Sequence, residues 1–269
     1  MHKIKTLILF YVFILSGLFG EEIKQSLYPI KQRLPTKYVE YKVAFIDYEG
    51  NLVIPFEYSW GSIFENGVAA AKKDKKNYLI NLENEKYFEC DFYLYYGFSD
   101  GLCCAEKDNK YGYINQKGEV VIPFIYDSAE EFQKGYAKVY QGKESFYIDK
   151  KGNRAKVDPE YFHTDGEYTV FIDSVTKKYG LKKMSGEILI PAKYTYLSLP
   201  NRYGYCIFST KVDDPVYGLM TLDNQVIYSD DTFFELWPFK EGMAIFNQRN
   251  REGGYLRDDG KIFWFKDYY

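Results

Sequence analysis

Histidine is nearly absent from this sequence, which has only His2 and His163 among its 269 residues. Ser-His-Asp triads and His-rich zinc sites both need histidines, and a single one is more often structural than catalytic. No Gly-rich phosphate loop or dinucleotide fingerprint is present. The acidic pairs at 213–214 and 230–231 lack the ligand spacing of a calcium loop. We therefore predict no cofactor, no metal site and no catalytic residue, although two of the many carboxylates could still meet in the fold.

An excess of positive charge is also lacking. The 35 Lys and Arg residues are outnumbered by 38 Asp and Glu residues, and the formal net charge is −3. The basic residues are scattered, often in expected turns such as 72–73 and 150–151. A nucleic-acid-binding surface needs clustered basic residues on a positively charged face, so nucleic acid is not expected as a partner.

Long apolar runs are missing except near the start, where residues 6–19 are almost wholly apolar between Lys3, Lys5 and the acidic pair at 21–22. A basic start, a short apolar core and a polar stop are typical of a secretory signal peptide, and the run is shorter than the ~20 residues of a membrane span. We expect residues 1–20 to be a cleaved signal peptide, with an uncleaved anchor as the alternative. The mature chain is then exported (periplasmic, outer-surface or secreted) with no further transmembrane segment, and loss of two lysines takes its charge from −3 to −5.

Cysteines are few: Cys90, Cys103, Cys104 and Cys206. Export permits disulfides. Cys103 and Cys104 are neighbours on an expected strand and so face opposite sides of it, which leaves at most one of them able to reach Cys90 readily. The alternative is that all four are small buried apolar residues, and whether any disulfide forms stays open.

The sequence does contain a repeated unit, which is clearest at 111–123, read YGYINQKGEVVIP. Two short β-prone runs flank a polar connection ending in Gly118, a hairpin pattern in which glycine supplies a positive φ. Pro123 removes a ladder donor, and we expect it to end the second strand. A connection from 124 to 135 and a third strand at 136–140 complete the unit, with no helical stripe of useful length.

The unit recurs with a period of 34 residues. Each expected hairpin turn follows the previous one by 34 residues, at Gly50, Asn84, Gly118, Gly152 and Gly186. Aromatic residues also share one phase, at Tyr58, Phe92, Tyr126 and Tyr194. Several columns that agree on one period indicate a repeat architecture. The aromatic column is predicted to pack within and between units rather than to stack on a ligand.

About seven such units can be counted. Short strands, polar turns and a fixed period predict an all-β repeat protein of about seven short antiparallel β units, β-propeller-like, with an open β-solenoid as the alternative. A unit of 34 residues is short for a four-stranded blade, which is the main objection to a propeller. We expect a linker over 21–37 and a repeat domain over 38–269. A strand over 37–41 could supply the partner that the first hairpin otherwise lacks.

The unit resembles the WG repeat, also called the KWG repeat. The pattern is aromatic-Gly-(Phe/Tyr)-Ile-(Asp/Asn), then a turn Gly, Ile-Pro, Tyr-Asp and a later Gly-x-Ala, and it is matched here at 111–115, Gly118, 122–123, 126–127 and 135–137. The resemblance covers about residues 43–265 and is strongest in the first, third and fifth units, with tyrosine in the usual place of tryptophan. It implies a β-repeat module of bacterial proteins, often exported, and it offers no catalytic residues to carry over.

Localised function is expected where units depart from the repeat. In the second unit, 88–89 replaces Ile-Pro and aromatic residues crowd the expected loop that follows; we predict a binding site there at Tyr93, Tyr95, Tyr96 and Phe98. A second eroded aromatic loop is expected at 196–205. The favoured function is an exported, non-enzymatic β-repeat scaffold that mediates protein or cell-envelope interaction. The alternative is a carbohydrate-binding module or hydrolase that uses acidic and aromatic loops, with an envelope glycan as its partner.

Overall fold

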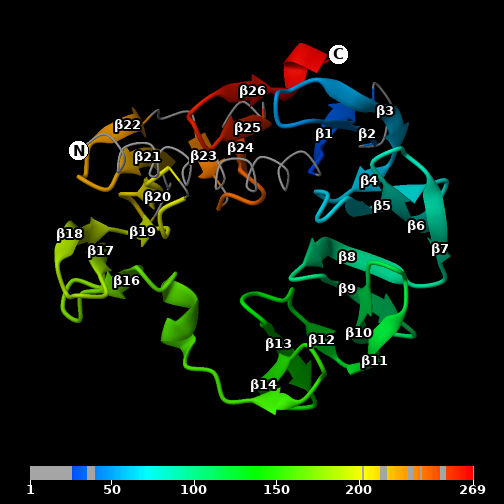
Figure 1. Cartoon of the computed structure of the whole chain (residues 1–269), viewed down its shortest axis with the longest axis horizontal. Helices are drawn as coiled ribbons and strands as arrows, with labels where there is room; N and C mark the ends of the chain where they lie inside the picture. Colours follow the sequence, from blue (N-terminus) through cyan, green and yellow to red (C-terminus); the bar gives the residue numbers. More distant parts are fainter. Residues whose placement is uncertain are drawn as a thin grey trace, which may run out of the picture. The chain divides into compact units, whose positions relative to one another are not determined.

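A computed structural model of the chain describes residues 26–34, 40–201, 203–212, 217–229, 233–236, 238–248 and 253–268 (Figure 1). The chain divides into two compact units, Met1–Ala155 and Lys156–Tyr269, which are taken one at a time below.

The first unit contains four small sheets in chain order. The strands of the first two are β1 (Tyr28–Arg33), β2 (Tyr41–Ile46) and β3 (Leu52–Tyr58), then β4 (Trp60–Gly61), β5 (Val68–Lys73), β6 (Lys76–Asn81) and β7 (Lys86–Cys90). The strands of the third and fourth are β8 (Tyr93–Ser99), β9 (Leu102–Lys107), β10 (Lys110–Asn115) and β11 (Val120–Tyr126), then β12 (Ser128–Ala129), β13 (Tyr136–Gln141), β14 (Glu144–Asp149) and β15 (Arg154–Ala155).

The second unit contains three sheets and two short 3₁₀ helices. It begins with η1 (Pro159–His163) and the fifth sheet, β16 (Tyr168–Ile172), β17 (Tyr179–Lys183) and β18 (Ile188–Tyr194). The sixth sheet is β19 (Tyr196–Leu197), β20 (Tyr205–Ser209), β21 (Tyr217–Thr221) and β22 (Val226–Ser229). The seventh is β23 (Phe233–Leu236), β24 (Met243–Gln248), β25 (Gly253–Arg257) and β26 (Ile262–Trp264), followed by η2 (Phe265–Tyr268).

The predicted fold class is confirmed: an all-β repeat whose described strands form seven small antiparallel sheets, each built like a propeller blade. Strands that are consecutive in the chain are neighbours in every sheet, and no described strand pairs with a strand of another sheet. A β-solenoid would instead join strands of successive units into continuous sheets. A unit of 34 residues can still hold four strands, because the first strands of the second, fourth and sixth sheets are only two residues long.

The predicted hairpin turns lie where the period places them. Gly118 has φ 83° and Asn84 has φ 64°, both in the left-handed region that suits Gly and Asn. The Asp or Asn that ends the preceding strand organises the turn through its side chain: Asn115 Oδ1 accepts hydrogen bonds from the backbone N–H of Lys117 (2.9 Å) and Glu119 (3.0 Å). This explains why the sequence pattern needs Asp or Asn three residues before the turn glycine.

The prediction that Pro123 ends its strand is wrong. β11 runs on through Tyr126, so the expected connection at 124–127 is largely strand. Tyr113 pairs with Ile122 but Tyr111 pairs with Tyr126, so β11 carries extra residues between these two pairs. β11 is an edge strand, where a proline costs no shared ladder bond. The irregular backbone passes directly over Gly112, where an added Cβ would lie 2.5 Å from the Ile122 carbonyl oxygen.

The predicted linker over 21–37 is wrong in part, because residues 28–33 form β1. This strand pairs with β2 along its whole length, and Tyr28 and Ile30 are fully buried against the first sheet. The first hairpin therefore has the N-terminal partner strand that was expected, but from different residues. Most of the strand expected over 37–41 lies outside the described residues, and Tyr41 itself begins β2.

Within each compact unit, neighbouring sheets pack through buried apolar clusters. The phased aromatic residues Tyr58, Phe92, Tyr126 and Tyr194 all belong to these clusters and are at most 7% exposed, which confirms their predicted packing role. Cys103 packs between the second and third sheets, whereas Cys104 packs between the third and fourth, as their opposite facing requires. All four cysteines are buried, and none of them forms a disulfide.

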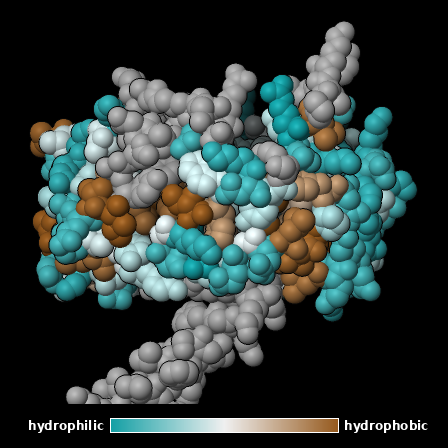
Figure 2. Space-filling model, turned by 90° about the horizontal axis from the view of Figure 1, so that it is seen from above, coloured by the Kyte–Doolittle hydropathy of each residue, from teal (hydrophilic) through white to brown (hydrophobic). Residues whose placement is uncertain are grey.

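On the face seen in Figure 2, polar and apolar residues are mixed, and the apolar residues lie in separate patches. Several exposed apolar side chains belong to edge strands, among them Leu52, Val120 and Ile188. No helix among the described residues is both long and apolar enough to cross a membrane.

Candidate functional site

The third sheet departs from its neighbours at its first strand. In the second, fourth and sixth sheets this strand is the two-residue β4, β12 or β19, each a multiple of 34 residues from the others. In the third sheet it is β8, which is seven residues long. The segment expected to be an aromatic loop at 93–98 is therefore an edge strand of the third sheet, which corrects the loop prediction.

β8 is interrupted by a bulge at Tyr96 and Gly97. Tyr95 pairs with Cys104 and Phe98 pairs with Cys103, so two residues of β8 have no partner on β9. Tyr96 has φ 62° and Gly97 has φ 91°. A positive φ is strained for a bulky residue such as tyrosine and is held only by surrounding structure. Here a Cβ on residue 97 would overlap the side chain of Ser62, which follows β4, so the glycine allows the bulge to pack against that segment.

The bulge separates the four predicted binding residues into two groups. Tyr93 and Tyr96 are 57% and 61% exposed. Tyr95 is half-buried, with its ring 6.2 Å from that of Tyr96. Phe98 is fully buried in the core between the second and third sheets. Three of the predicted residues can therefore contribute to a surface, whereas Phe98 acts as the anchor below it.

Charged groups fix the edges of this tyrosine surface. Tyr95 donates its hydroxyl to Glu106 Oε2 at 2.6 Å, and this bond together with burial raises the pKa of Tyr95. Lys72 Nζ lies 5.7 Å from the centre of the Tyr93 ring, within cation–π range. Tyr95 is thereby held as a hydrogen-bonded phenol, while Tyr93 and Tyr96 present their rings to solvent. Such a surface can bind an apolar or planar group but supplies no reactive side chain.

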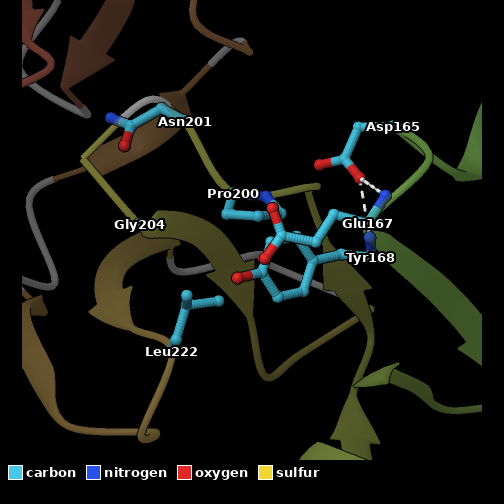
Figure 3. A pocket seen from close by; sticks show the side chains of 7 residues that line it. All are labelled: Asp165, Glu167, Tyr168, Pro200, Asn201, Gly204 and Leu222. Carbon is cyan, nitrogen blue, oxygen red and sulfur yellow. Dashed lines mark hydrogen bonds between the residues drawn. The ribbon is translucent and has the colours of Figure 1, made fainter. Parts of the chain in front are cut away.

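A pocket of about 310 Å³ lies in the second unit (Figure 3). Its walls come from the turn before β16, from the β19–β20 connection and from the end of β21, and they comprise Asp165, Glu167, Tyr168, Pro200, Asn201, Gly204 and Leu222. The expected aromatic loop at 196–205 thus contributes three wall residues, none of them aromatic. Sequence reasoning missed Glu167, Tyr168 and Leu222, because only their convergence in the fold distinguishes them from other acidic, aromatic and apolar residues.

The pocket side chains have defined partners. Asp165 Oδ1 accepts hydrogen bonds from the backbone N–H groups of Glu167 (2.9 Å) and Tyr168 (2.7 Å). A hydrogen bond to the Glu167 carboxylate is the main cause that raises the pKa of Tyr168. Asn201 Oδ1 accepts from the backbone N–H groups of Tyr203 (2.9 Å) and Tyr205 (3.0 Å), the same arrangement as Asn115 in a regular hairpin. The pocket is therefore acceptor-rich and built on well-anchored turns.

Metal-binding clusters are absent from the described part of the chain, where no group of three or more His, Cys, Asp and Glu side chains converges. His163 ends η1 and is exposed, and it is not among the residues that line the pocket.

A family model described as the WG containing repeat matches residues 44–76, 79–111 and 111–144. Within residues 44–144 the chain therefore matches three tandem WG repeats. The second WG repeat is matched even though its Ile-Pro pair is replaced, while the fifth unit, expected to be among the strongest, lies outside the matched residues. The bulged strand β8 lies inside the second WG repeat, and all of the pocket residues lie beyond the third.

No curated protein matches the sequence. Among solved structures, the chain is similar to Kluyveromyces lactis Hsv2, with 8% identity over 71% of each chain and a TM-score of 0.39. A form of KlHsv2 with loop 6CD replaced by a Gly-Ser linker gives 5% identity over 84% of this chain and 89% of that one, with a TM-score of 0.43. BamB from Moraxella catarrhalis gives 8% identity over 88% and 87%, with a TM-score of 0.36. At these values the similarity assigns no function to this chain.

Proposed function

We propose that this protein is an exported, non-enzymatic β-repeat scaffold that binds a protein or a cell-envelope component through Tyr93 and Tyr96. The observation that supports this most is the bulge in β8, where a tyrosine is held at φ 62° with 61% of its surface exposed. Strained backbone conformations cluster at active sites, ligand-binding sites and switch regions. Tyrosine also contributes disproportionately to binding energy in protein interfaces.

The surroundings of the two tyrosines support the same role. Phe98, fully buried beneath them, and Tyr95, hydrogen-bonded to Glu106, give β8 a rigid base, so little side-chain order has to be gained on binding. Export is supported by the apolar run at 6–19, which has the flanks of a signal peptide. If this is correct, intact-mass measurement of protein recovered outside the cytoplasm gives a chain beginning near Glu21.

The test compares wild-type protein with a Tyr93→Ala/Tyr96→Ala variant. Immobilised protein is incubated with the envelope fraction of the producing cell, the bound component is identified, and its affinity is measured with purified material. We expect the double variant to bind at least tenfold more weakly, since each exposed aromatic anchor contributes about 1–2 kcal/mol. Tyr41→Ala is the matched control, because Tyr41 is 43% exposed on the first sheet, away from β8 in the chain. Equal affinity of wild type and double variant would refute the tyrosine site.

The wild-type protein and the double variant also distinguish a carbohydrate ligand from a protein partner. Tyrosine rings also stack on sugar rings, so binding to purified envelope glycans that is lost in Tyr93→Ala/Tyr96→Ala would replace a protein partner with a glycan at the same surface. Release of sugar from those glycans by the wild-type protein would overturn the non-enzymatic part of the proposal.

A further inference from the structure

A second binding site is indicated by the pocket between the fifth and sixth sheets, in a part of the chain beyond the three WG repeats. We infer that this pocket binds an alkylammonium or guanidinium cation, such as a lysine or arginine side chain or a small amine. The inference is independent of the tyrosine surface on β8, which lies in the other compact unit.

The charge of the pocket selects the sign of the ligand. Two carboxylates, Asp165 and Glu167, line it, and no basic residue is among the lining residues that the structure describes. An anionic ligand would be repelled by this pair, whereas a cation gains both Coulomb attraction and charge-assisted hydrogen bonds. Both carboxylates are exposed, so neither needs a buried counter-ion within the protein.

Asp165 is positioned by the backbone rather than by another charge. Its Oδ1 atom accepts the N–H groups of Glu167 and Tyr168, and the dashed lines in Figure 3 show both bonds leaving one side of the carboxylate. Its Oδ2 atom has no hydrogen-bond partner among the described residues and remains available as an acceptor. The turn is further held by Thr164, whose Oγ1 donates to the Tyr168 carbonyl at 2.6 Å.

Glu167 lies two residues after Asp165 in the same turn, and its side chain is drawn beside that of Tyr168 (Figure 3). Its backbone carbonyl accepts the Met184 N–H at 2.9 Å, which ties this residue to the fifth sheet. Tyr168 places an aromatic ring in the same wall as the two carboxylates. A ring next to two carboxylates suits a cation further, because the ring face attracts positive charge.

The remaining walls select the kind of cation. Pro200 and Leu222 give the pocket apolar surface, which a hydrated metal ion could not use but the methylene chain of lysine or arginine could. A volume of about 310 Å³ is at the lower end of small-molecule sites and can accommodate one such side chain. Shape and charge therefore favour an organic cation with an apolar stem.

The experiment titrates the intact protein with Nα-acetyl-lysine-N-methylamide, its arginine equivalent and spermidine, with the norleucine equivalent as the uncharged probe. Amide chemical shifts from ¹H–¹⁵N NMR report both the site and the affinity. We expect shifts centred on 165–168 and 200–204 for the cations, and at least tenfold weaker binding for norleucine. Binding should weaken severalfold between low salt and 0.5 M NaCl, because salt screens exposed charges.

The variants separate charge from folding. Glu167→Gln removes one charge, and Asp165→Asn removes the other while keeping an oxygen that can accept the two backbone bonds. Each is expected to weaken cation binding at least fivefold. Glu187→Gln is the matched control, since Glu187 is an exposed acid of the fifth sheet paired with Lys183 outside the pocket. The wild-type salt titration stays decisive if either variant folds poorly.

The outcomes distinguish the sources of the cation. Binding of the amino-acid probes without spermidine indicates a basic side chain of a partner protein, and the reverse indicates a small amine; either supports the inference. Norleucine bound as tightly as lysine, shifts located elsewhere, no binding by any cation, or unchanged affinity in both pocket variants would each overturn it. These results leave the tyrosine test on β8 unaffected.

Discussion

At the scale of single residues, one hydrogen bond recurs between neighbouring sheets. Tyr58 donates its hydroxyl to Asn84 Oδ1 at 2.5 Å, and Tyr194 donates to Asn224 Oδ1 at 2.7 Å. Both asparagines occupy, with positive φ, the turn between the last two strands of their sheet, where the other described sheets have glycine. Asparagine tolerates this conformation and adds an acceptor that glycine lacks. This hydrogen bond therefore links a sheet to the turn of the next sheet only where the tyrosine and the asparagine are both present.

The Tyr194–Asn224 pair gives a direct measure of this tie. We expect Tyr194→Phe and Asn224→Gly each to lower the free energy of unfolding by about 0.5–1.5 kcal/mol, because each removes one net hydrogen bond. Because glycine also adopts the positive φ of this turn, the loss of stability in Asn224→Gly measures the contribution of the asparagine side chain. Urea unfolding of both single variants and the double variant tests it. Fully additive losses would show that the two side chains do not interact.

The cysteines illustrate burial at the same scale. Desolvation raises the pKa of the Cys90, Cys104 and Cys206 thiols to about 12. A thiol with a raised pKa stays protonated near neutral pH and is a poor nucleophile. Of the two alternatives for the cysteines, the structure therefore shows buried packing residues without disulfides. Cys103 and Cys104 accordingly pack in different clusters.

At the scale of strands, the Ile-Pro pair has a role beyond ending a strand. The buried isoleucine anchors an edge strand, and the proline follows in the middle of β3, β11 and β18. These strands expose apolar side chains, including Val120 (49%) and Ile125 (46%) on β11. An exposed apolar edge strand can pair with another chain, and a proline with an irregular backbone opposes this. The sequence pattern therefore protects the edges of its own sheets.

Replacing Pro123 tests this protection. We expect Pro123→Val to self-associate with rising protein concentration, because it restores an N–H and adds a β-branched side chain on an exposed edge. Size-exclusion chromatography with light scattering measures the change. Pro123→Lys is the matched control: it restores the same N–H but adds a charge, and it should remain as monomeric as the wild type. Association of both variants, or of neither, would contradict the role assigned to proline.

The same scale shows what the sequence could predict. Turns at Gly118 and Asn84 were predictable because a positive φ limits the choice of residue. The two-residue strands such as Trp60–Gly61 were not, since so short a segment has no alternation and exists only through its partner. β1 was missed because it lies outside the period. The tyrosines of β8 were found by composition, but the bulge that buries Phe98 and exposes Tyr96 depends on packing against Ser62.

At the scale of the whole chain, the repeat loses its regularity where the two compact units meet in sequence. After β15 the Ile-Pro pair is missing. The 3₁₀ helix η1 lies 34 residues before β19, at the repeat position where the second, fourth and sixth sheets have a two-residue strand. Most described side chains from 151 to 167 are exposed, and none of the described residues in this range is buried. Segments with few buried contacts open at lower free energy than the sheets around them.

Limited proteolysis measures this difference in local stability. Within 40–201, we expect trypsin to cut folded protein first after Lys156, which is exposed between β15 and η1. The lysines of tight hairpins, such as Lys75 between β5 and β6, should resist longer, because protease binding requires an extended segment and both flanking strands are paired. Mass spectrometry of early time points identifies the cut. Lys156→Gln should delay cleavage in this region severalfold, with unchanged thermal unfolding as its control. A first cut at Lys75 would show that the least stable segment lies within a WG repeat instead of beyond all three.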